Sequence, residues 1–180
     1  SRWASDRISQ DEGGVVAFIS NGAWLDSNSG EGFRRCLEKE FTSIYVLNLR
    51  GNQRTSGELS RKEGGKIFGS GSRTPIAITF LVKNPTMKGQ KAIIRYHDIG
   101  DYLTREQKLK IVKEFSSISS RKLDWQIIES NEKADWLNQR DGLFDSFILL
   151  GDKKENYQKI FTIFSSGDVT ARDSWCYNAS

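Results

Sequence analysis

The fold is decided by residues 14–49, which read GVVAFISNGAWLDSNSGEGFRRCLEKEFTSIYVLNL. Residues 14–20 and 43–49 are continuous runs of β-branched, aliphatic and aromatic residues of strand length, which are typical of strands buried on both faces of a parallel sheet. Between them, residues 31–41 carry apolar side chains at helical spacing. A strand, a helix and a strand joined by short loops predict a βαβ unit with a right-handed crossover, and therefore an α/β fold.

Two further strands are expected downstream. Residues 75–83 (PIAITFLVK) begin with a proline, which a strand tolerates at its first position. Residues 91–99 (KAIIRYHDI) follow after the turn NPTMKGQ, so we expect these two strands to pair with each other. A short helix is expected within residues 1–10, where apolar residues recur at roughly helical spacing.

After residue 100 the pattern becomes helical. Residues 104–115 predict a helix that begins at Thr104 as its N-cap. The apolar face of this helix is formed by Leu109, Val112 and Phe115. Residues 123–128 predict a short strand, and residues 132–140 predict another helix.

Length, composition and charge limit the possible classes of protein. The 180 residues match one domain or slightly more, and we divide them into a sheet domain, residues 1–100, and a mainly helical connector, residues 101–180. The chain holds 27 Lys and Arg against 23 Asp and Glu, with a net charge of +4 and a pI near 9.1, which is compatible with a polyanionic partner without requiring one. No apolar run approaches the roughly 20 residues needed to cross a bilayer, and no secretory leader opens the sequence, so we expect no membrane contact and a cytoplasmic location.

Few residues of the sequence suit metal binding or acid–base catalysis. Cys36 and Cys176 lie too far apart in the sequence to form a metal-binding pair. His97 is the only histidine, and we expect it to be structural or exposed. Asp98 and Asp101 are expected to form a solvated turn before a helix, with an acid–base pair as the weaker alternative. The sequence therefore predicts no metal site.

Residues 50–74 (RGNQRTSGELSRKEGGKIFGSGSRT), called the basic loop below, have no apolar periodicity, and a loop of this length is usually functional or disordered. It is not a phosphate-binding P-loop, because Gly65-Lys66 lacks the upstream glycine and the following Ser or Thr. Glycine turns that bind cofactors open a helix, whereas residues 68–71 open a strand. Arg, Ser, Thr and Asn suit phosphate and sugar oxygens, and a solvated surface loop is the open alternative. The candidate DNA contacts in the loop are Arg50, Arg54, Arg61, Lys62, Lys66 and Arg73.

A family resemblance covers most of the chain. Residues 14–85 resemble the second half of the catalytic domain of γ-class adenine-N6 DNA methyltransferases. More narrowly, they are similar to the methyltransferase part of the Type ISP restriction–modification enzymes, which join nuclease, helicase-like translocase, methyltransferase and target-recognition parts in one chain. Residues 96–109 (YHDIGDYLTREQKL) and 165–178 (SSGDVTARDSWCYN) resemble the same group, and the most specific block is 43–84.

The resemblance implies a partial Rossmann-like methyltransferase sheet that contains its distal strands. Residues 14–20, 43–49 and 75–83 would be the fifth, sixth and seventh strands, with the last one inserted antiparallel. Residues 101–180 would be the connector that leads into target recognition. The AdoMet-binding glycine turn and the catalytic [DNS]-P-P-[YF] motif should lie upstream, because the only Asn-Pro pair, Asn84-Pro85, lacks the second proline and the aromatic residue.

The resemblance also implies a chemistry and a set of partners. The intact bacterial enzyme would methylate adenine N6 in DNA with AdoMet, and other domains of the same chain would cleave DNA. Its partners would be double-stranded DNA and the upstream nuclease, helicase-like and AdoMet-binding parts of the polypeptide. This chain alone is expected to hold no catalytic residue, to bind no AdoMet and to be inactive. A non-catalytic nucleic-acid-binding or scaffold module with a partial α/β fold is the alternative.

Candidate site residues also lie outside the basic loop. Asn21 and Trp24 follow the first strand, at the sheet edge where α/β folds bind ligands. By the resemblance, Phe80 or Leu81 would pack against the flipped adenine, and a purely structural core side chain is the alternative. Near the end of the chain, Thr170 and Arg172 supply donors suited to a phosphate, with a purely structural strand as the alternative for that segment.

Overall fold

The computed structural model describes residues 2–9, 11–69, 72–87, 89–140, 143, 146–151 and 158–163. The chain falls into two compact units, Ser1–Gln139 and Arg140–Ser180. The first unit therefore continues past residue 100, where the sequence placed the end of the sheet domain. It includes a strand and a buried tryptophan that lie beyond that point.

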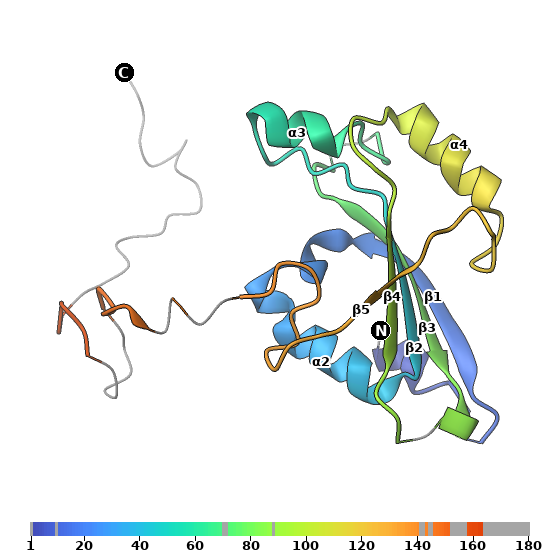
Figure 1. Cartoon of the computed structure of the whole chain (residues 1–180), viewed down its shortest axis with the longest axis horizontal. Coiled ribbons are helices and arrows are strands. Elements are labelled where there is room, and N and C mark those ends of the chain that lie inside the picture. The colour runs from blue at the N-terminus through green and yellow to red at the C-terminus, as the bar shows by residue number, and fades with distance from the viewer. Residues whose placement is uncertain are drawn as a thin grey trace. The chain divides into compact units, whose positions relative to one another are not determined.

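A five-stranded sheet forms the centre of the first unit (Figure 1). Its strands are β1 (Gly14–Asn21), β2 (Ser43–Asn48), β3 (Ile76–Lys83), β4 (Ile93–Asp98) and β5 (Gln126–Ile128), and their order in space is β1-β3-β2-β4-β5. β3 is antiparallel to both β1 and β2, so β1 and β2 run in the same direction. β4 is parallel to β2, and β5 is antiparallel to β4. The predicted α/β class is confirmed, and this partly parallel open sheet is consistent with a partial Rossmann-like fold.

The expected pairing between the third and fourth strands is wrong. β4 pairs with β2, starting at Ser43 opposite Ile93. Both hydrogen-bonding edges of β3 are already occupied, by β1 on one side and β2 on the other. The chain after β3 must therefore cross the end of β2 before it can join the sheet, and Ile93 N–H donates to Thr42 O at 3.0 Å where it does so.

Helices lie on both faces of this sheet. The helices are α1 (Arg2–Ser5), α2 (Glu31–Glu40), α3 (Gly57–Glu63) and α4 (Arg105–Phe115), and short 3₁₀ turns occupy Gly22–Leu25, Asn28–Gly30 and Pro85–Met87. α2 and α4 lie on opposite sides of the sheet (Figure 1). α4 begins where the sequence predicted, because Thr104 and Gln107 form a reciprocal capping box.

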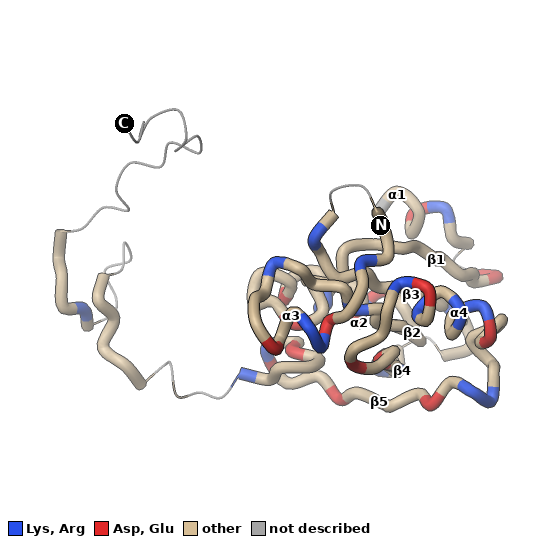
Figure 2. Tube along the Cα trace, turned by 90° about the horizontal axis from the view of Figure 1, so that it is seen from above, with Lys and Arg blue, Asp and Glu red and all other residues tan. Residues whose placement is uncertain are grey.

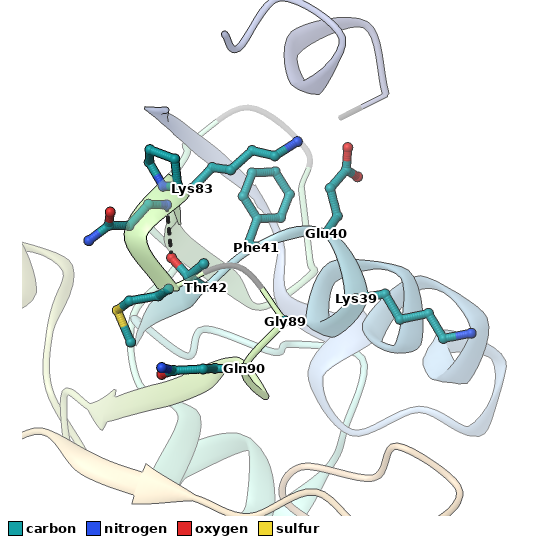
Figure 3. Close-up of a pocket in the computed structure, with 10 residues that line it drawn as sticks. Lys39, Glu40, Phe41, Thr42, Lys83, Gly89 and Gln90 are labelled. Carbon is teal, nitrogen blue, oxygen red and sulfur yellow. Dashed lines mark hydrogen bonds between the residues drawn. The ribbon is translucent and has the colours of Figure 1, made fainter. Parts of the chain in front are cut away.

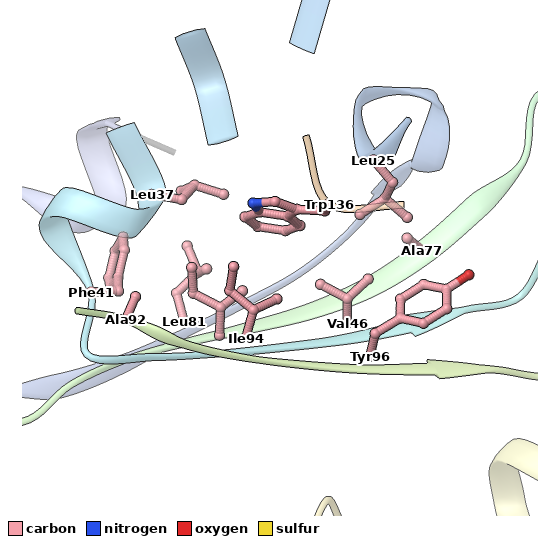
Figure 4. Close-up of a cluster of buried hydrophobic side chains, with 11 residues drawn as sticks. Leu25, Leu37, Phe41, Val46, Ala77, Leu81, Ala92, Ile94, Tyr96 and Trp136 are labelled. Carbon is pink, nitrogen blue, oxygen red and sulfur yellow. The ribbon is translucent and has the colours of Figure 1, made fainter. Parts of the chain in front are cut away.

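Each face of the sheet has its own core. The core on the α2 side consists of Leu25, Leu37, Phe41, Ile44, Val46, Ala77, Leu81, Ala92, Ile94, Tyr96 and Trp136 (Figure 4). The core on the α4 side consists of Leu47, Leu49, Ile67, Ile76, Ile99 and Leu123, with Val112 and Phe115 of α4 packed against it. The third apolar residue predicted for that helix, Leu109, is 42% exposed, whereas its neighbour Lys108 is buried.

The helix predicted for residues 132–140 is absent, and this segment crosses α2 in an irregular conformation. Arg34 of α2 is 0% exposed and fastens the segment. Its Nε donates to Ala134 O at 2.6 Å, and its Nη2 pairs with Asp135 Oδ1 at 3.1 Å. Ala134 has a φ of 52°, which no helix interior contains. Trp136 then enters the core, and its Nε1 donates to Glu38 Oε1 at 2.6 Å. These contacts outweigh the helical propensity of the segment.

β1 lies at the edge of the sheet, where its residues alternate between half-buried and exposed. Burial on both faces, expected from its apolar run, is therefore not found in this unit. Val15 is 61% exposed and Ile19 is 59% exposed. Among the described residues, no strand pairs with the outer edge of β1.

The described part of the second unit is short and apolar. Leu149 and Lys159 form an isolated parallel bridge, with Ile160 N–H donating to Leu149 O at 2.9 Å. Several of its side chains are largely exposed: Leu143, Phe147, Ile148, Leu150, Ile160, Phe161 and Ile163. Thr170 and Arg172, the predicted phosphate contacts, lie outside the described residues. Within the described part of both units, no helix is long and apolar enough to traverse a bilayer.

Candidate nucleic-acid interface

The candidate interface begins where two parallel strands end. β2 and β4 finish at Asn48 and Asp98, which lie opposite each other in register. The basic loop follows β2 directly, and residues 99–104 follow β4. The carboxyl ends of parallel strands are the edge where α/β sheets place their ligand sites.

A polar network fixes the backbone at this edge. Asn48 Nδ2 donates to Tyr96 Oη at 2.9 Å, and Tyr96 Oη donates in turn to Asp98 Oδ2 at 3.0 Å. Arg50 Nε donates to Asp98 Oδ1 at 2.6 Å, and its Nη1 pairs with Asp101. These bonds hold Arg50 at a φ of 56°, where the chain turns out of β2 into the basic loop.

The environment of the network sets the protonation of its members. Burial alone would lower the pKa of Arg50, but the hydrogen bond to Asp98 and the charges of Asp98, Asp101 and Glu63 raise the pKa above its ordinary value. Burial raises the pKa of Tyr96, and the hydrogen bond from Asn48 only partly opposes this shift. Arg50 therefore stays charged and Tyr96 stays a neutral donor. Asp98 ends β4 and Asp101 is exposed in the turn before α4, and both carboxylates accept hydrogen bonds from the Arg50 guanidinium.

The basic loop has a defined path over its described residues. Leu49 N–H donates to Ile76 O at 2.8 Å, and Gln53 N–H donates to Arg73 O at 2.9 Å, so the two ends of the loop continue as an antiparallel ribbon beyond β2 and β3. α3 forms between these ends, in a stretch that has no apolar periodicity. At the far end of α3, Glu63 Oε2 accepts a hydrogen bond from the Asn52 backbone at 2.8 Å.

Two glycines of the loop serve close backbone packing. Gly64 has a φ of 68°, and a Cβ placed on it would lie 2.2 Å from Leu103 O. A Cβ on Gly65 would lie 2.5 Å from the Arg105 backbone nitrogen, and Gly65 N–H donates to Leu103 O at 2.9 Å. The glycine pair therefore lets the loop lie directly against the start of α4.

The predicted DNA contacts fall into groups that differ in exposure. Arg54, Arg61 and Arg73 are exposed, whereas Lys62 and Lys66 are half-buried. Arg61 pairs with Glu58 of the same helix at 3.4 Å. The backbone bond between residues 53 and 73 brings Arg54 and Arg73 onto neighbouring segments. Acidic residues lie among the basic ones around α3 (Figure 2).

One exposed aromatic residue of the loop was not among the residues predicted to contact DNA. Phe68 is 48% exposed, although its neighbour Ile67 is buried in the α4-side core. It follows the half-buried Lys66 and precedes the exposed Arg73 in the loop. An exposed aromatic in a loop rich in basic residues is a combination that suits stacking on a nucleic-acid base. Its position among glycines and basic residues was the signal that could have identified it.

The structure does not bring the predicted base-pocket residues into one site. Asn21 and Trp24 line a cavity of 430 Å³ on the α2 side of β1, where the Trp24 ring lies 5.1 Å from that of Phe33. Leu81 is 0% exposed inside the core on that side. Phe80 points to the other face, into an apolar cavity of 130 Å³ beside α4. Neighbouring residues of a strand point to opposite faces, so Phe80 and Leu81 cannot share one pocket.

Another cavity, of 240 Å³, lies at the opposite end of the sheet (Figure 3). Phe41, Thr42 and Lys83 line it, together with the turn after β3. Thr42 Oγ1 accepts a hydrogen bond from the Asn84 backbone at 3.0 Å, which closes this turn onto the start of β2. The cavity thus lies at the amino end of β2, whereas the polar network lies at its carboxyl end.

His97 was expected to be structural or exposed, and its contacts are those of a structural residue. Its Nδ1 lies 2.8 Å from Asp124 O, and its ring makes edge contacts with Phe115 and Trp125. Among the described residues, no group of three or more His, Cys, Asp or Glu side chains could hold a metal ion.

No protein-family model matches the sequence, and no curated protein matches it. Solved structures do match. A nuclease-deletion mutant of the Type ISP restriction–modification enzyme LlaGI, in complex with a DNA substrate mimic, is 49% identical over 97% of this chain, with a TM-score of 0.79. The ATP-dependent Type ISP restriction–modification enzyme LlaBIII bound to DNA is 40% identical over 97% of this chain, with a TM-score of 0.86.

The DrdV–DNA complex is 33% identical over 97% of this chain, with a TM-score of 0.78. This chain spans only 13%, 11% and 17% of the LlaGI, LlaBIII and DrdV chains, respectively. Over nearly its whole length, the chain is therefore similar to one part of the Type ISP restriction–modification enzymes LlaGI and LlaBIII and to one part of DrdV, and all three structures contain DNA or a DNA mimic.

Proposed function

We propose that this chain is a DNA-contacting part of a Type ISP restriction–modification enzyme, and that its first unit is the distal half of an adenine-N6 methyltransferase domain. The observation that carries the proposal is the order β1-β3-β2, with β3 antiparallel between two strands that share a direction. This order agrees with the inserted seventh strand that the family resemblance implies. The identity of 49% to LlaGI over 97% of this chain supports the Type ISP part of the proposal.

AdoMet would bind to another part of the intact polypeptide. In the first unit, β1 leads into the 3₁₀ turn Gly22–Leu25, and β2 leads into the basic loop. Neither connection opens directly into an α-helix, as cofactor-binding glycine turns do. The glycine pair at residues 64 and 65 is already packed against the start of α4. The turns after β1 and β2 do not fit the cofactor, so we assign its site and the catalytic motif to upstream residues of the intact polypeptide.

The role proposed for this chain is to hold DNA beside that active site. Methylation of a base requires the base to leave the helix, so the duplex must be gripped while it opens. Arg54 and Arg73 are exposed on neighbouring segments of the basic loop, and both suit phosphate oxygens. Phe68 supplies a flat apolar surface in the same loop. Nuclease and helicase-like parts of the same bacterial polypeptide would be the further partners.

The test uses the full polypeptide that contains this chain. DNA is incubated with the enzyme and AdoMet, and N6-methyladenine is measured by mass spectrometry of the digested DNA. We expect methylation by the wild-type enzyme and a large loss after combined replacement of Arg54, Phe68 and Arg73 by alanine. If the wild-type enzyme forms no N6-methyladenine, the methyltransferase assignment is wrong. DNA binding without methylation would instead favour the non-catalytic nucleic-acid-binding module, which the lack of a cofactor turn in the described residues also suits.

A further inference from the structure

We propose that Lys108 of α4 is the positioning residue of the basic loop. It fixes the loop conformation in which Arg54 and Arg73 face outward. The part of this inference that concerns DNA rests on the proposed function, whereas the part that concerns loop conformation stands on the contacts of Lys108 alone.

Lys108 is buried and its apolar neighbour is exposed, which is the opposite of the burial that the sequence of α4 predicts. Lys108 is 0% exposed, while the adjacent Leu109 is 42% exposed. A buried ammonium group is costly unless hydrogen bonds compensate for the lost water. Lys108 Nζ donates to Glu63 O at 2.7 Å and to Gly65 O at 2.9 Å. The cost of burial is thus offset by contacts with the basic loop.

These contacts join the beginning of the loop to the end of α3. Glu63 O accepts from Lys108 and also from the Gly51 backbone, at 3.1 Å. Glu63 Oε2 accepts from the Asn52 backbone at 2.8 Å. Gly65 O, the second acceptor, belongs to the glycine pair that lies against the start of α4. One ammonium group therefore connects the exit from β2, the end of α3 and the helix that supports both.

The two exposed arginines depend on this arrangement through short backbone paths. Arg54 follows Asn52 by two residues, and its N–H donates to Asn52 Oδ1 at 3.1 Å. Arg73 is joined through its carbonyl to Gln53 N–H at 2.9 Å. Loss of the ammonium group would leave Glu63 O and Gly65 O without this donor and free residues 51–54 to move. The expected result is a loop that no longer presents both arginines together.

A purely structural role for Lys108 predicts different behaviour. Loss of the buried ammonium group would then lower the free energy of unfolding of the whole unit, because two carbonyls would lose their donor. The effect of a positioning residue must instead be confined to the loop. The decisive quantity is local exchange at the amides of residues 51, 52 and 65, compared with the overall free energy of unfolding.

The experiment compares Lys108→Met with the control Lys110→Met, which replaces an exposed lysine on the same helix. Hydrogen–deuterium exchange is measured on the 180-residue chain. In Lys108→Met we expect exchange about tenfold faster at these three amides and unchanged exchange in β2 and β4, as for a local opening that has lost one or two hydrogen bonds. Wild-type exchange rates at all three amides would overturn the proposal. If Lys108→Met does not fold, Lys108→Gln is compared with Lys110→Gln, and the same amides decide.

DNA affinity is measured next, on a fluorescein-labelled duplex over a series of salt concentrations. Lys108→Met should weaken binding roughly fivefold and flatten the log–log salt slope by about 0.9 for each lost phosphate contact. In a background that carries Arg54→Ala and Arg73→Ala, Lys108→Met should have little further effect, because all three changes act on the same contacts. Full additivity would show that Lys108 does not act through these arginines. A further outcome is faster exchange in Lys108→Met together with wild-type DNA affinity in Arg54→Ala and in Arg73→Ala. It would leave Lys108 as the positioning residue of the loop and contradict the DNA role of the loop.

Discussion

Among the described residues, one fully buried cation on each face of the sheet fastens an irregular segment, and the two cations differ in what they bind. On the α2 side, Arg34 pairs with the carboxylate of Asp135 and also donates to backbone carbonyls, among them Trp24 O at 2.6 Å. On the α4 side, Lys108 donates to two backbone carbonyls of the basic loop. We call Arg34 with its acceptors the α2-side clamp and Lys108 with its acceptors the α4-side clamp. The α2-side clamp contains a direct ion pair, whereas Lys108 donates to carbonyls and feels the charges of Glu63 and Asp98 without pairing directly with either. We infer that the α2-side clamp stabilises a permanent part of the fold. The α4-side clamp holds a segment that adapts to a ligand.

The largest effect is expected on the α2 side. Arg34→Met should lower the free energy of unfolding by about 3–5 kcal/mol, because it breaks the buried ion pair with Asp135 and removes the donor to the Ala134 and Trp24 carbonyls. Urea denaturation followed by tryptophan fluorescence measures this change. The control is Arg35→Met, since Arg35 lies next to Arg34 in α2 but is exposed. A loss of less than about 1 kcal/mol for Arg34→Met would mean that the two clamps do not differ as proposed.

The next effect tests how closely the basic loop packs on α4. Gly64→Ala should cost about 2–3 kcal/mol, because Gly64 has a positive φ and its Cβ would meet Leu103 O. Gly57→Ala is the matched control: Gly57 has a φ of 62°, and its Cβ would meet nothing within 4 Å. The difference between the two variants in thermal denaturation isolates the contact with α4. Equal losses would show that only backbone strain matters at Gly64.

A smaller effect should appear in DNA binding alone. Arg73→Ala should flatten the log–log dependence of affinity on salt by about 0.9, the value for one phosphate contact, and leave stability unchanged. Arg121→Ala serves as the control, because Arg121 is an exposed residue outside the basic loop. Binding to unrelated duplexes should weaken equally, since phosphate contacts carry no sequence information. An identical slope for wild type and Arg73→Ala would remove this residue from the interface.

The smallest effect concerns the polar network, and it depends on pH. Tyr96→Phe should cost about 1 kcal/mol near neutral pH, through the lost hydrogen bonds to Asn48 and Asp98. The folded state holds the pKa of Tyr96 above its ordinary value of 10.0, so the unfolded chain loses this proton first as the pH rises. The contribution of Tyr96 is thus complete below pH 10.0 and decreases above it. Urea denaturation of both proteins on either side of this pH checks the trend, which a constant difference would contradict.

Local sequence patterns predicted much of the fold, whereas the remaining features depend on contacts between residues far apart in the sequence. The run 43–49, the helical spacing of 31–41 and the cap at Thr104 predicted β2, α2 and the start of α4. The insertion of β3 between β1 and β2 could be expected only from the family resemblance, because hydrogen-bonding partners across a sheet leave no mark in the sequence of one strand.

The candidate interface was predictable in composition and not in geometry. The basic loop was recognised by its arginines and glycines, but the acceptors of Arg50 lie some 50 residues away, at Asp98 and Asp101. The buried Lys108 and Arg34 bind mainly backbone carbonyls, which every residue type carries, so no side-chain pattern announces them. Phe80 and Leu81 could not be distinguished without the register, because a shift of one residue exchanges the two faces of a strand.

The exposed edge of β1 has a consequence for the chain in solution. Within the described ranges no strand covers this edge, and an unpaired edge beside exposed apolar side chains is a template on which another copy can add a strand. Two copies of net charge +4 repel each other, and added salt weakens that repulsion while it also weakens attraction to DNA. Ionic strength therefore has opposite effects on DNA binding and on self-association. Low salt favours single copies bound to DNA, and high salt favours contacts between copies.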